Sequence, residues 1–462
     1  MKKSLLAIAA MTAFAGAAQA QSSVTVYGIL DVGVMGQTNS GSLNTSTGGT
    51  SANLKDPASA SYPRNGNSFG FMAGGESANR IGFKGQEDLG GGTKAIFQLE
   101  QRFSSANGSS NATGLAGNGS TTVGMGNMSS FGDSSNQGQL FNGMAYAGLS
   151  NDKYGTLTLG RQQTLMLDNI GGYDPVNAYS FSPLAYSGSF AGGGYTDNGR
   201  ANGALKLKEK IMGFDVNALY APGGYAGNNG VGTRLEGQIG YEAAKWGVQA
   251  LMDMQEGATS LTGVTYGQAQ ATTAGTYNPN IGAAGQTAGT NMVNATIANT
   301  RSTMVTAKFS PVDNLWLKAG FQYMYFGTPS DVQYYVGQPV LPNGSGFSVF
   351  NYTALQQPIT KNTFWLGANY DFTPAVKGSV GYYQQNINAT TNSSATTRAG
   401  KQNYISAMAE YYLSKRTNLY AAGTLAGYMG SSLVTSQATT GGATATTVNQ
   451  QFTYGLGMRH TF

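Results

Sequence analysis

The chain ends with the stretch Gln451-Phe-Thr-Tyr-Gly-Leu-Gly-Met-Arg-His-Thr-Phe462, in which apolar or aromatic side chains occupy nearly every second position. Successive side chains of a β-strand point to opposite faces of the sheet, so a strand here has one largely apolar face. That face carries Phe452, Tyr454, Leu456, Met458, His460 and Phe462. The pattern predicts a strand with one apolar and one polar face that ends on an aromatic residue.

The same period of two recurs along the chain in segments of roughly ten residues. The clearest segments are Val24–Met35, Thr93–Phe103 and Tyr404–Leu413, where apolar side chains share one face and mostly small or polar ones take the other. Very short turns alternate with long stretches rich in Gly, Asn, Ser and Thr. This asymmetry is typical of a transmembrane β-barrel, whose connections are short on one side of the membrane and long on the other.

Seven short turns and eight longer connections separate these segments. The turns lie near Glu87–Gly92, Ser150–Gly155, Lys210–Gly213, Ala243–Trp246, Pro311–Asn314, Asp371–Pro374 and Ser414–Asn418. The connections lie near residues 37–78, 104–139, 163–200, 223–232, 257–300, 327–360, 388–400 and 430–448. Together they join sixteen strands, an even number that suits a closed antiparallel barrel, since lipid cannot satisfy an open sheet edge. A barrel of that size has a lumen wide enough to hold water.

The composition favours strands and turns. The 462 residues include 68 Gly, 27 Tyr and 20 Phe, and only 10% are charged. Aromatic residues favour strands and Gly favours turns. The mean hydropathy of −0.23 suits a wall that alternates lipid-facing apolar and lumen-facing polar side chains. We expect an all-β fold without a helical segment of note; the alternative is a soluble β-sandwich, although sandwiches seldom need sixteen strands.

The N-terminus has the features of an export signal. Lys2 and Lys3 precede an apolar run from Leu5 to about Ala18, and Ala18-Gln-Ala20 fits a small-residue cleavage site. The run is short for a transmembrane anchor. We expect residues 1–20 to be a cleaved signal peptide and residues 21–462 to form one barrel domain in the outer membrane of a Gram-negative bacterium.

Charge and the rare residue types exclude several functions. Without the signal peptide, 26 − 2 = 24 basic residues face 21 acidic ones, a net charge of +3 that gives no reason to expect nucleic acid as a partner. With no cysteine and a single histidine, His460, the chain is a poor candidate for thiolate or histidine metal sites and for a Ser-His-Asp triad. We expect no metal, no cofactor and no enzymatic activity.

Several motifs resemble the general porins of β-proteobacteria. They are Ser22-Ser-Val-Thr-Val-Tyr-Gly-Ile-Leu-Asp31, Ser77-Ala-Asn-Arg-Ile-Gly-Phe-Lys-Gly-Gln-Glu-Asp-Leu-Gly-Gly-Gly-Thr-Lys-Ala-Ile-Phe-Gln-Leu-Glu100, Ala145-Tyr-Ala-Gly-Leu149, Tyr154-Gly-Thr-Leu-Thr-Leu-Gly-Arg-Gln162 and the closing strand. The resemblance implies a barrel with long extracellular loops and a third loop folded into the lumen, usually a homotrimer in outer-membrane lipid. It also implies that the assembly machinery of the outer membrane recognises Phe462.

The resemblance further implies a pore constriction. The third connection contains Asp168 and the sequence Tyr173-Asp174-Pro175, and Asp174 is expected at the narrowest point. The opposite wall of such porins carries a row of arginines, of which Arg80 matches the first position and Arg200 the last.

The middle position of this row is Gly143, so that position departs from the family pattern. Arg102 has lumen parity on its strand and would take the missing place. Glu100 and Lys84 have lumen parity as well, and they either pair with the arginines or simply solvate the wall. Each single charge has the alternative interpretation of an ordinary wetted residue.

These features predict a water-filled channel for passive diffusion of small hydrophilic solutes and ions. The channel is weakly anion-selective if Arg80, Arg102 and Arg200 face mainly Asp174, whereas acidic residues of other loops, such as Asp197 and Asp331, would reverse the preference. An enzyme inside a barrel is one rival, although it lacks a base. A surface adhesin or structural barrel with a closed lumen is the other, and the long polar loops favour it.

Overall fold

The computed structural model describes the barrel wall and part of its connections. The described residues are 23–38, 68–106, 108, 115–116, 140–186, 199–223, 230–265, 292–329, 351–354, 358–388, 390–391, 396–397, 399–430, 434–435, 447–448 and 450–462. The expected signal peptide, residues 1–20, lies outside these ranges, as do Asp197 and Asp331 and much of the expected long connections.

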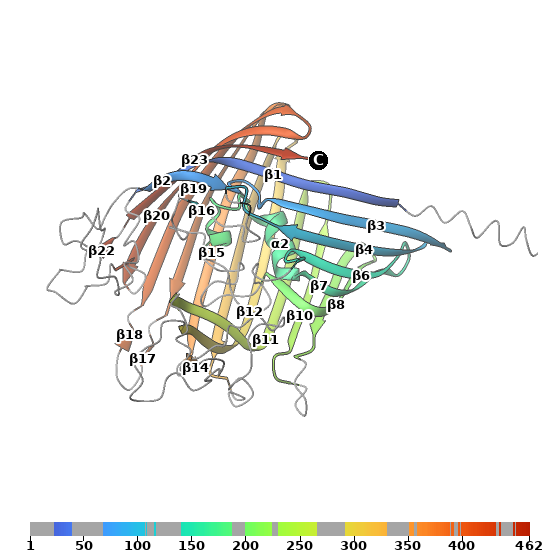
Figure 1. The fold of residues 1–462 in the computed structure, drawn as a ribbon, viewed down its shortest axis with the longest axis horizontal. Coiled ribbons are helices and arrows are strands. Elements are labelled where there is room, and N and C mark those ends of the chain that lie inside the picture. Colours follow the sequence, from blue (N-terminus) through green and yellow to red (C-terminus); the bar gives the residue numbers. More distant parts are fainter. Residues whose placement is uncertain are drawn as a thin grey trace, which may run out of the picture.

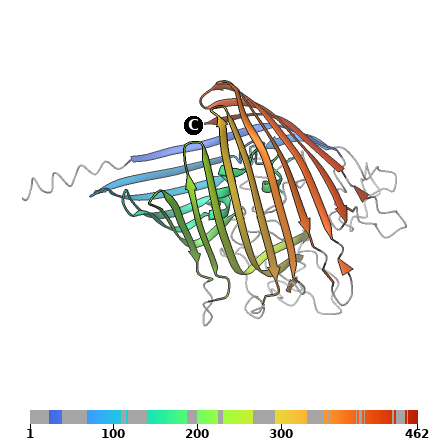
Figure 2. The same cartoon turned by 180° about the vertical axis from the view of Figure 1, so that it is seen from behind.

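Sixteen strands of the described residues form one closed antiparallel barrel (Figure 1), as predicted. They are β1 (Ser23–Gln37), β3 (Arg80–Gly90), β4 (Thr93–Arg102), β6 (Met144–Asn151), β7 (Gly155–Gln163), β8 (Arg200–Ile211), β9 (Phe214–Ala221), β10 (Arg234–Glu242), β11 (Trp246–Thr265), β12 (Met292–Val312), β13 (Leu315–Gly327), β15 (Ile359–Thr373), β16 (Val376–Ile387), β19 (Gly400–Ser414), β20 (Thr417–Gly430) and β23 (Gln450–Thr461). The barrel closes because β1 pairs with β3 on one side and with β23 on the other. Figure 2 shows the far wall, where the long strands coloured green to orange lie side by side.

Shorter elements accompany the wall. The short strands are β2 (Ser68–Ala73), β5 (Leu115–Ala116), β14 (Asn351–Ala354), β17 (Thr390–Thr391), β18 (Thr396–Thr397), β21 (Val434–Thr435) and β22 (Thr447–Val448). The helices are α2 (Leu165–Tyr173) and α3 (Pro183–Tyr186). Neither described helix has the length and apolar character needed to cross a membrane.

The seven predicted short turns are confirmed, because each joins two consecutive wall strands. The C-terminus lies at the same end of the barrel, where the N–H of Thr461 donates to the carbonyl of Arg416, in the turn between β19 and β20 (2.8 Å). The start of β1 is there too, since Ser23 pairs with Gln86 near the end of β3.

The two faces of the wall differ as the period of two predicts. Outward positions hold exposed apolar side chains, for example Val24 (66% exposed), Leu159 (60%) and Leu456 (59%). Inward positions hold polar and charged side chains together with buried apolar ones such as Leu251, Met304 and Trp365. The apolar core therefore lies inside the barrel, where Leu165, Ile170 and other residues of that connection pack on the wall.

Two features differ from the sequence expectations. The expected connection 37–78 contains strand β2, so the second wall strand consists of two pieces, β2 and β3, separated by six residues. The third connection contains α2, a helix of nine residues, where we expected no helix of note. The residue that caps the helix start is Thr164, whose hydroxyl accepts a hydrogen bond from the N–H of Leu167 (3.2 Å) and so satisfies one free amide there.

Candidate functional site

Arg80, Arg102 and Glu100 lie together on the inner wall. Arg80 of β3 and Arg102 of β4 are direct partners across the sheet. The carboxylate of Glu100 lies 3.6 Å from a guanidinium nitrogen of Arg80 and 3.4 Å from one of Arg102. The Glu100 side chain is 1% exposed, whereas that of Arg80 is 21% exposed. Two positive charges thus share one negative charge, and the Arg80 side chain is partly accessible from the lumen.

A chain of hydrogen bonds holds Glu100 in place. The Tyr27 hydroxyl donates to Glu100 (3.1 Å), the Gln98 amide donates to the Tyr27 hydroxyl (2.5 Å), and the Tyr146 hydroxyl donates to Gln98 (2.7 Å). Lys84 lies outside the arginine group, because it follows Arg80 by four residues along β3, roughly 13 Å in an extended strand. Its ammonium lies 5.5 Å from the centre of the Tyr27 ring instead.

Arg200 and Arg161 extend the arginine group along the wall. Arg200 is 4% exposed and lies within electrostatic reach of Arg102, Arg161 and Glu100. Arg161 has outward parity by strict alternation, but the register shifts here, because Arg161 alone stands opposite Asn202 and Gly203. Its guanidinium donates to the Asn142 carbonyl (2.8 and 3.0 Å) and to the Asn202 amide oxygen (2.5 Å).

The third connection starts against β8 and β10 of the wall. The N–H of Leu165 donates to the Glu236 carboxylate of β10 (2.5 Å), and Asp168 of α2 pairs with the ammonium groups of Lys206 (2.6 Å) and Lys208 (2.5 Å) of β8. A carboxylate at the start of a helix and a paired Asp168 both stabilise α2 in this position. Figure 1 shows α2 inside the barrel.

The Tyr173–Asp174 step lies on the wall as well. The Tyr173 hydroxyl donates to Glu242, and burial together with this carboxylate raises the pKa of the phenol. The Asp174 carboxylate accepts hydrogen bonds from the hydroxyls of Ser182 and Tyr383. Burial raises the pKa of the Asp174 carboxyl, although these hydrogen bonds act in the opposite direction.

Asp174 therefore occupies a different place from the one that the sequence suggested. We expected its carboxylate at the narrowest point, facing the arginines, but the residue is 1% exposed. Within the described part of the third connection, Tyr179 is the residue in electrostatic reach of both Arg80 and Arg200. Asp168, the other acidic residue of 164–186, is paired with two lysines.

Sequence reasoning missed a buried ion group beneath α2. Arg234 binds Glu236 (2.6 Å) and Asp253 (2.8 Å), and all three side chains are 1% exposed or less. A signal was present, because Arg234 and Glu236 flank the outward-facing Leu235 on β10 and therefore share lumen parity. The group was overlooked because no family motif covers it.

The last residues lie where the period of two predicts. The backbone of Phe462 exchanges two hydrogen bonds with Gly28 of β1 (3.0 and 3.1 Å), and its side chain is 48% exposed. His460 is on the same outward face, where its ring nitrogen lies 2.9 Å from the Thr417 hydroxyl. No structural observation tests the expected recognition of Phe462, which stays a prediction.

A closed barrel of sixteen antiparallel strands with an apolar outer face, a charged inner face and a connection packed inside defines the class of outer-membrane channel barrels. The comparisons with known proteins then give the family. The model of the Gram-negative porin family matches residues 7–431, so the chain belongs to that family.

Individual relatives agree with this family. An outer membrane porin protein of Bordetella pertussis is 35% identical over 178 residues, 38% of each chain. Outer membrane porin protein 32 of Delftia acidovorans is 29% identical over 285 residues, 60% of this chain and 66% of that protein. The matched stretches therefore span less than two thirds of these relatives.

Solved structures of low identity share the fold over nearly the whole chain. The anion-selective porin from Comamonas acidovorans has a TM-score of 0.60 at 19% identity and covers 96% of this chain and 100% of its own. OmpT of Vibrio cholerae has a TM-score of 0.54 at 12% identity and covers 96% of this chain and 98% of its own.

Proposed function

We propose that the protein is a diffusion channel of the outer membrane, which lets small hydrophilic solutes and ions pass through a water-filled lumen. The observation that carries this proposal is the closed sixteen-stranded wall, whose inner face is lined by charged and polar side chains while the outer face is apolar. Sixteen strands enclose more space than side chains alone can fill. The described part of the third connection packs against the wall from β8 to β20 and leaves Arg80 partly exposed.

We further propose that the channel weakly prefers anions. Among the described residues, the three arginines expected from the sequence, Arg80, Arg102 and Arg200, lie near one carboxylate, Glu100, and carry with it a net charge of 3 − 1 = +2, to which Arg161 adds one positive charge. A fixed positive charge beside a narrow aqueous path lowers the energy of a passing anion and raises that of a cation. The Comamonas acidovorans porin is anion-selective, but at 19% identity its likeness concerns the fold alone. The arginine group of this chain carries the proposal.

The channel itself is tested by reconstituting the purified protein in planar lipid bilayers. We expect stepwise conductance increases in KCl, and we expect vesicles that contain the protein to swell in small neutral sugars. Protein that is folded, as judged by its heat-dependent shift on a gel, but passes no current would contradict the proposal. That result would favour the surface adhesin or structural barrel, which the long polar connections support. Enzymatic function has weaker support, because the single histidine lies on the outer face beside Thr417.

The resemblance to general porins also supports a homotrimer in outer-membrane lipid, delivered by the assembly machinery after removal of residues 1–20. Cross-linking of the protein in native outer membranes should give a band of three chains. Mass spectrometry of the same material should place the first residue at Gln21. A monomer would contradict the proposed homotrimer, and an uncleaved N-terminus would contradict the proposed signal peptide. Neither result would contradict the channel proposal.

A further inference from the structure

The second wall strand is interrupted at one place, opposite Asp31. Along β1, Val32 pairs with Ala73 of β2 and Ile29 pairs with Arg80 of β3. Two residues of β1 therefore stand opposite six residues, 74–79, of the neighbouring strand. This excursion is the segment 74–79, and it points into the barrel, because it contacts the third connection and inward-facing side chains of β20 and β23.

Asp31 holds the excursion in shape. Its carboxylate accepts hydrogen bonds from the N–H groups of Gly75 (3.2 Å), Glu76 (2.9 Å) and Ser77 (2.7 Å) and from the hydroxyl of Tyr420 (2.6 Å). Asp31 is 0% exposed. Three successive amides that converge on one buried carboxylate replace the sheet hydrogen bonds that the interrupted strand loses.

The third connection binds to this excursion through the backbone of Tyr179 and Ser180. The N–H of Tyr179 donates to the Glu76 carbonyl (3.0 Å), and the N–H of Ser180 donates to the Gly75 carbonyl (2.9 Å). The Ser180 hydroxyl adds a bond to the Gly74 carbonyl (2.5 Å). The third connection thus binds the carbonyls of residues 74–76, whereas Asp31 binds the N–H groups of residues 75–77.

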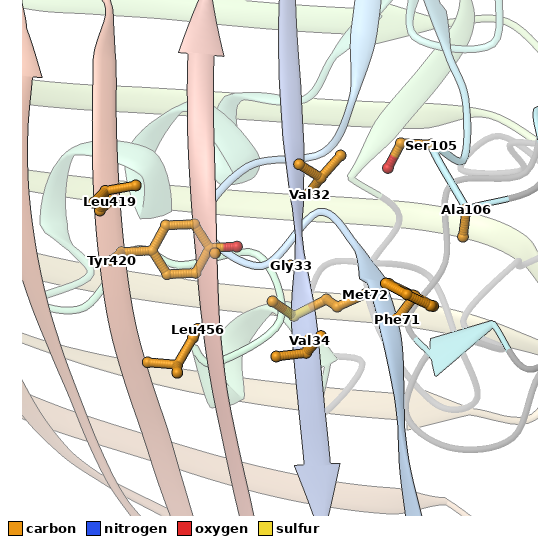
Figure 3. Close-up of a pocket in the computed structure, with 11 residues that line it drawn as sticks. Val32, Gly33, Val34, Phe71, Met72, Ser105, Ala106, Leu419, Tyr420 and Leu456 are labelled. Carbon is orange, nitrogen blue, oxygen red and sulfur yellow. The ribbon is translucent and has the colours of Figure 1, made fainter.

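Side chains of β20 and β23 also contact the excursion. Tyr420 of β20 packs against Gly75 so closely that any side chain at that glycine would collide with it. Glu76 binds Arg459 of β23 and accepts a hydrogen bond from Asn418 of β20 (2.7 Å). Figure 3 shows Tyr420 and Met72 reaching toward Gly33 of β1 from opposite sides. The excursion is held by β1 near one end of the chain and by β20 and β23 near the other. All of these contacts therefore form only when β1 pairs with β23.

We propose that the excursion is a clip that fixes the segment Ala178–Phe181 of the third connection inside the barrel, with Asp31 as its positioning residue. Asp31 does not touch the connection. It orients the carbonyls of residues 74–76, which the connection binds. Release of the clip would leave α2 anchored at the wall and Phe181 bound to Thr424 (2.7 Å), while Tyr179 and Ser180 lose their backbone partners and become free to move together with Ala178.

The test uses thiol labelling, which suits a chain without cysteine. Ala178 is 1% exposed, and Ala204 on the inner face of β8 is 0% exposed. Each is replaced by cysteine in the full-length protein, alone and with Asp31→Asn, and the folded proteins react with a water-soluble methanethiosulfonate reagent. We expect Asp31→Asn to speed labelling at residue 178 by about tenfold or more, because hydrogen bonds to a charged acceptor are the strong ones. Labelling at residue 204 should stay slow.

Two further variants sharpen the result. Tyr420→Phe removes one donor to Asp31 but keeps the ring, and it should speed labelling at residue 178 by a smaller factor. Asp215→Asn, a change of the same charge at a carboxylate that pairs with Lys210 (3.3 Å), should change neither site. Unchanged labelling at residue 178 in folded Asp31→Asn protein, or an equal rise at residues 178 and 204, overturns the proposal. If Asp31→Asn does not fold, Tyr420→Phe decides by the same criterion.

Discussion

At Asp174, burial and hydrogen bonding remove a charged side chain from the lumen. The carboxylate is enclosed by the hydroxyls of Ser182 and Tyr383, and the ammonium of Lys318 binds the Asp174 carbonyl (3.1 Å). Because burial raises the pKa of this carboxyl, the folded protein holds its proton more tightly than the unfolded chain does. Stability that comes from this difference is present in acid and is lost as the pH rises through the raised pKa.

The variant Asp174→Asn tests this placement. We expect its reversal potential in a KCl gradient to equal that of the wild type, because the buried carboxylate does not act on ions in the lumen. We also expect the stability difference between variant and wild type to shift in favour of the variant as the pH rises from acid to neutral. A clear gain in chloride preference on the Asp174→Asn substitution would show that the carboxylate faces the ion path after all.

At the scale of elements, the hairpin between β8 and β9 contains a strained residue. Met212 and Gly213 form its two-residue turn, with φ angles of 52° and 88°. Such a turn favours Asn followed by Gly, because Asn adopts positive φ at lower cost than other side chains. Met212 is 95% exposed and has little packing to lose.

Met212→Asn should therefore stabilise the barrel by about 0.5 kcal/mol. The measurement is the urea concentration at which half of the protein is folded in lipid vesicles, read from the heat-dependent gel shift. Met212→Ala serves as the control and should leave the midpoint unchanged, because Ala has no advantage at positive φ. A midpoint for Met212→Asn at or below that of the wild type would contradict the strain argument.

The sequence predicted the elements that depend on interactions between residues close together in the chain. Strands such as β19 follow from alternation within the strand itself, and hairpins follow from short polar turns between two such runs. The interruption of the second strand was not predictable in this way, because Asp31 and residues 74–79 are distant in sequence and meet only across the sheet. Helix α2 had a local signal, Thr164 before an apolar run, but the surrounding strand pattern masked it.

Part of the candidate site could likewise be predicted from the sequence, and part of it could not. Arg80, Arg102 and Glu100 follow from motif and strand parity, and the structure brings them together. The direction in which Asp174 points depends on how the third connection packs on the far wall, which no pattern within residues 163–200 encodes. Arg161 joined the group through a register shift opposite Asn202 and Gly203, which alternation alone cannot reveal.

At the scale of the whole molecule, positive charge gathers on the inner wall from β3 to β8. Among the described residues, Arg80, Arg102, Arg161 and Arg200 lie near one carboxylate, Glu100, while Asp168 of the third connection is paired with Lys206 and Lys208 of β8. The excess of positive charge therefore does not depend on an acidic residue across the lumen. We therefore propose that an anion preference arises from the balance of charge within the arginine group.

The most direct measurement is the reversal potential of single channels under a KCl gradient for the wild type, Arg102→Gln and Glu100→Gln. A unit charge about 4 Å from an ion in water changes its energy by about 1 kcal/mol, or roughly fivefold in a permeability ratio. We expect a chloride-biased wild type, a weaker bias in Arg102→Gln and a stronger bias in Glu100→Gln. A cation-biased wild type, or two variants that shift in the same direction, would contradict this proposal.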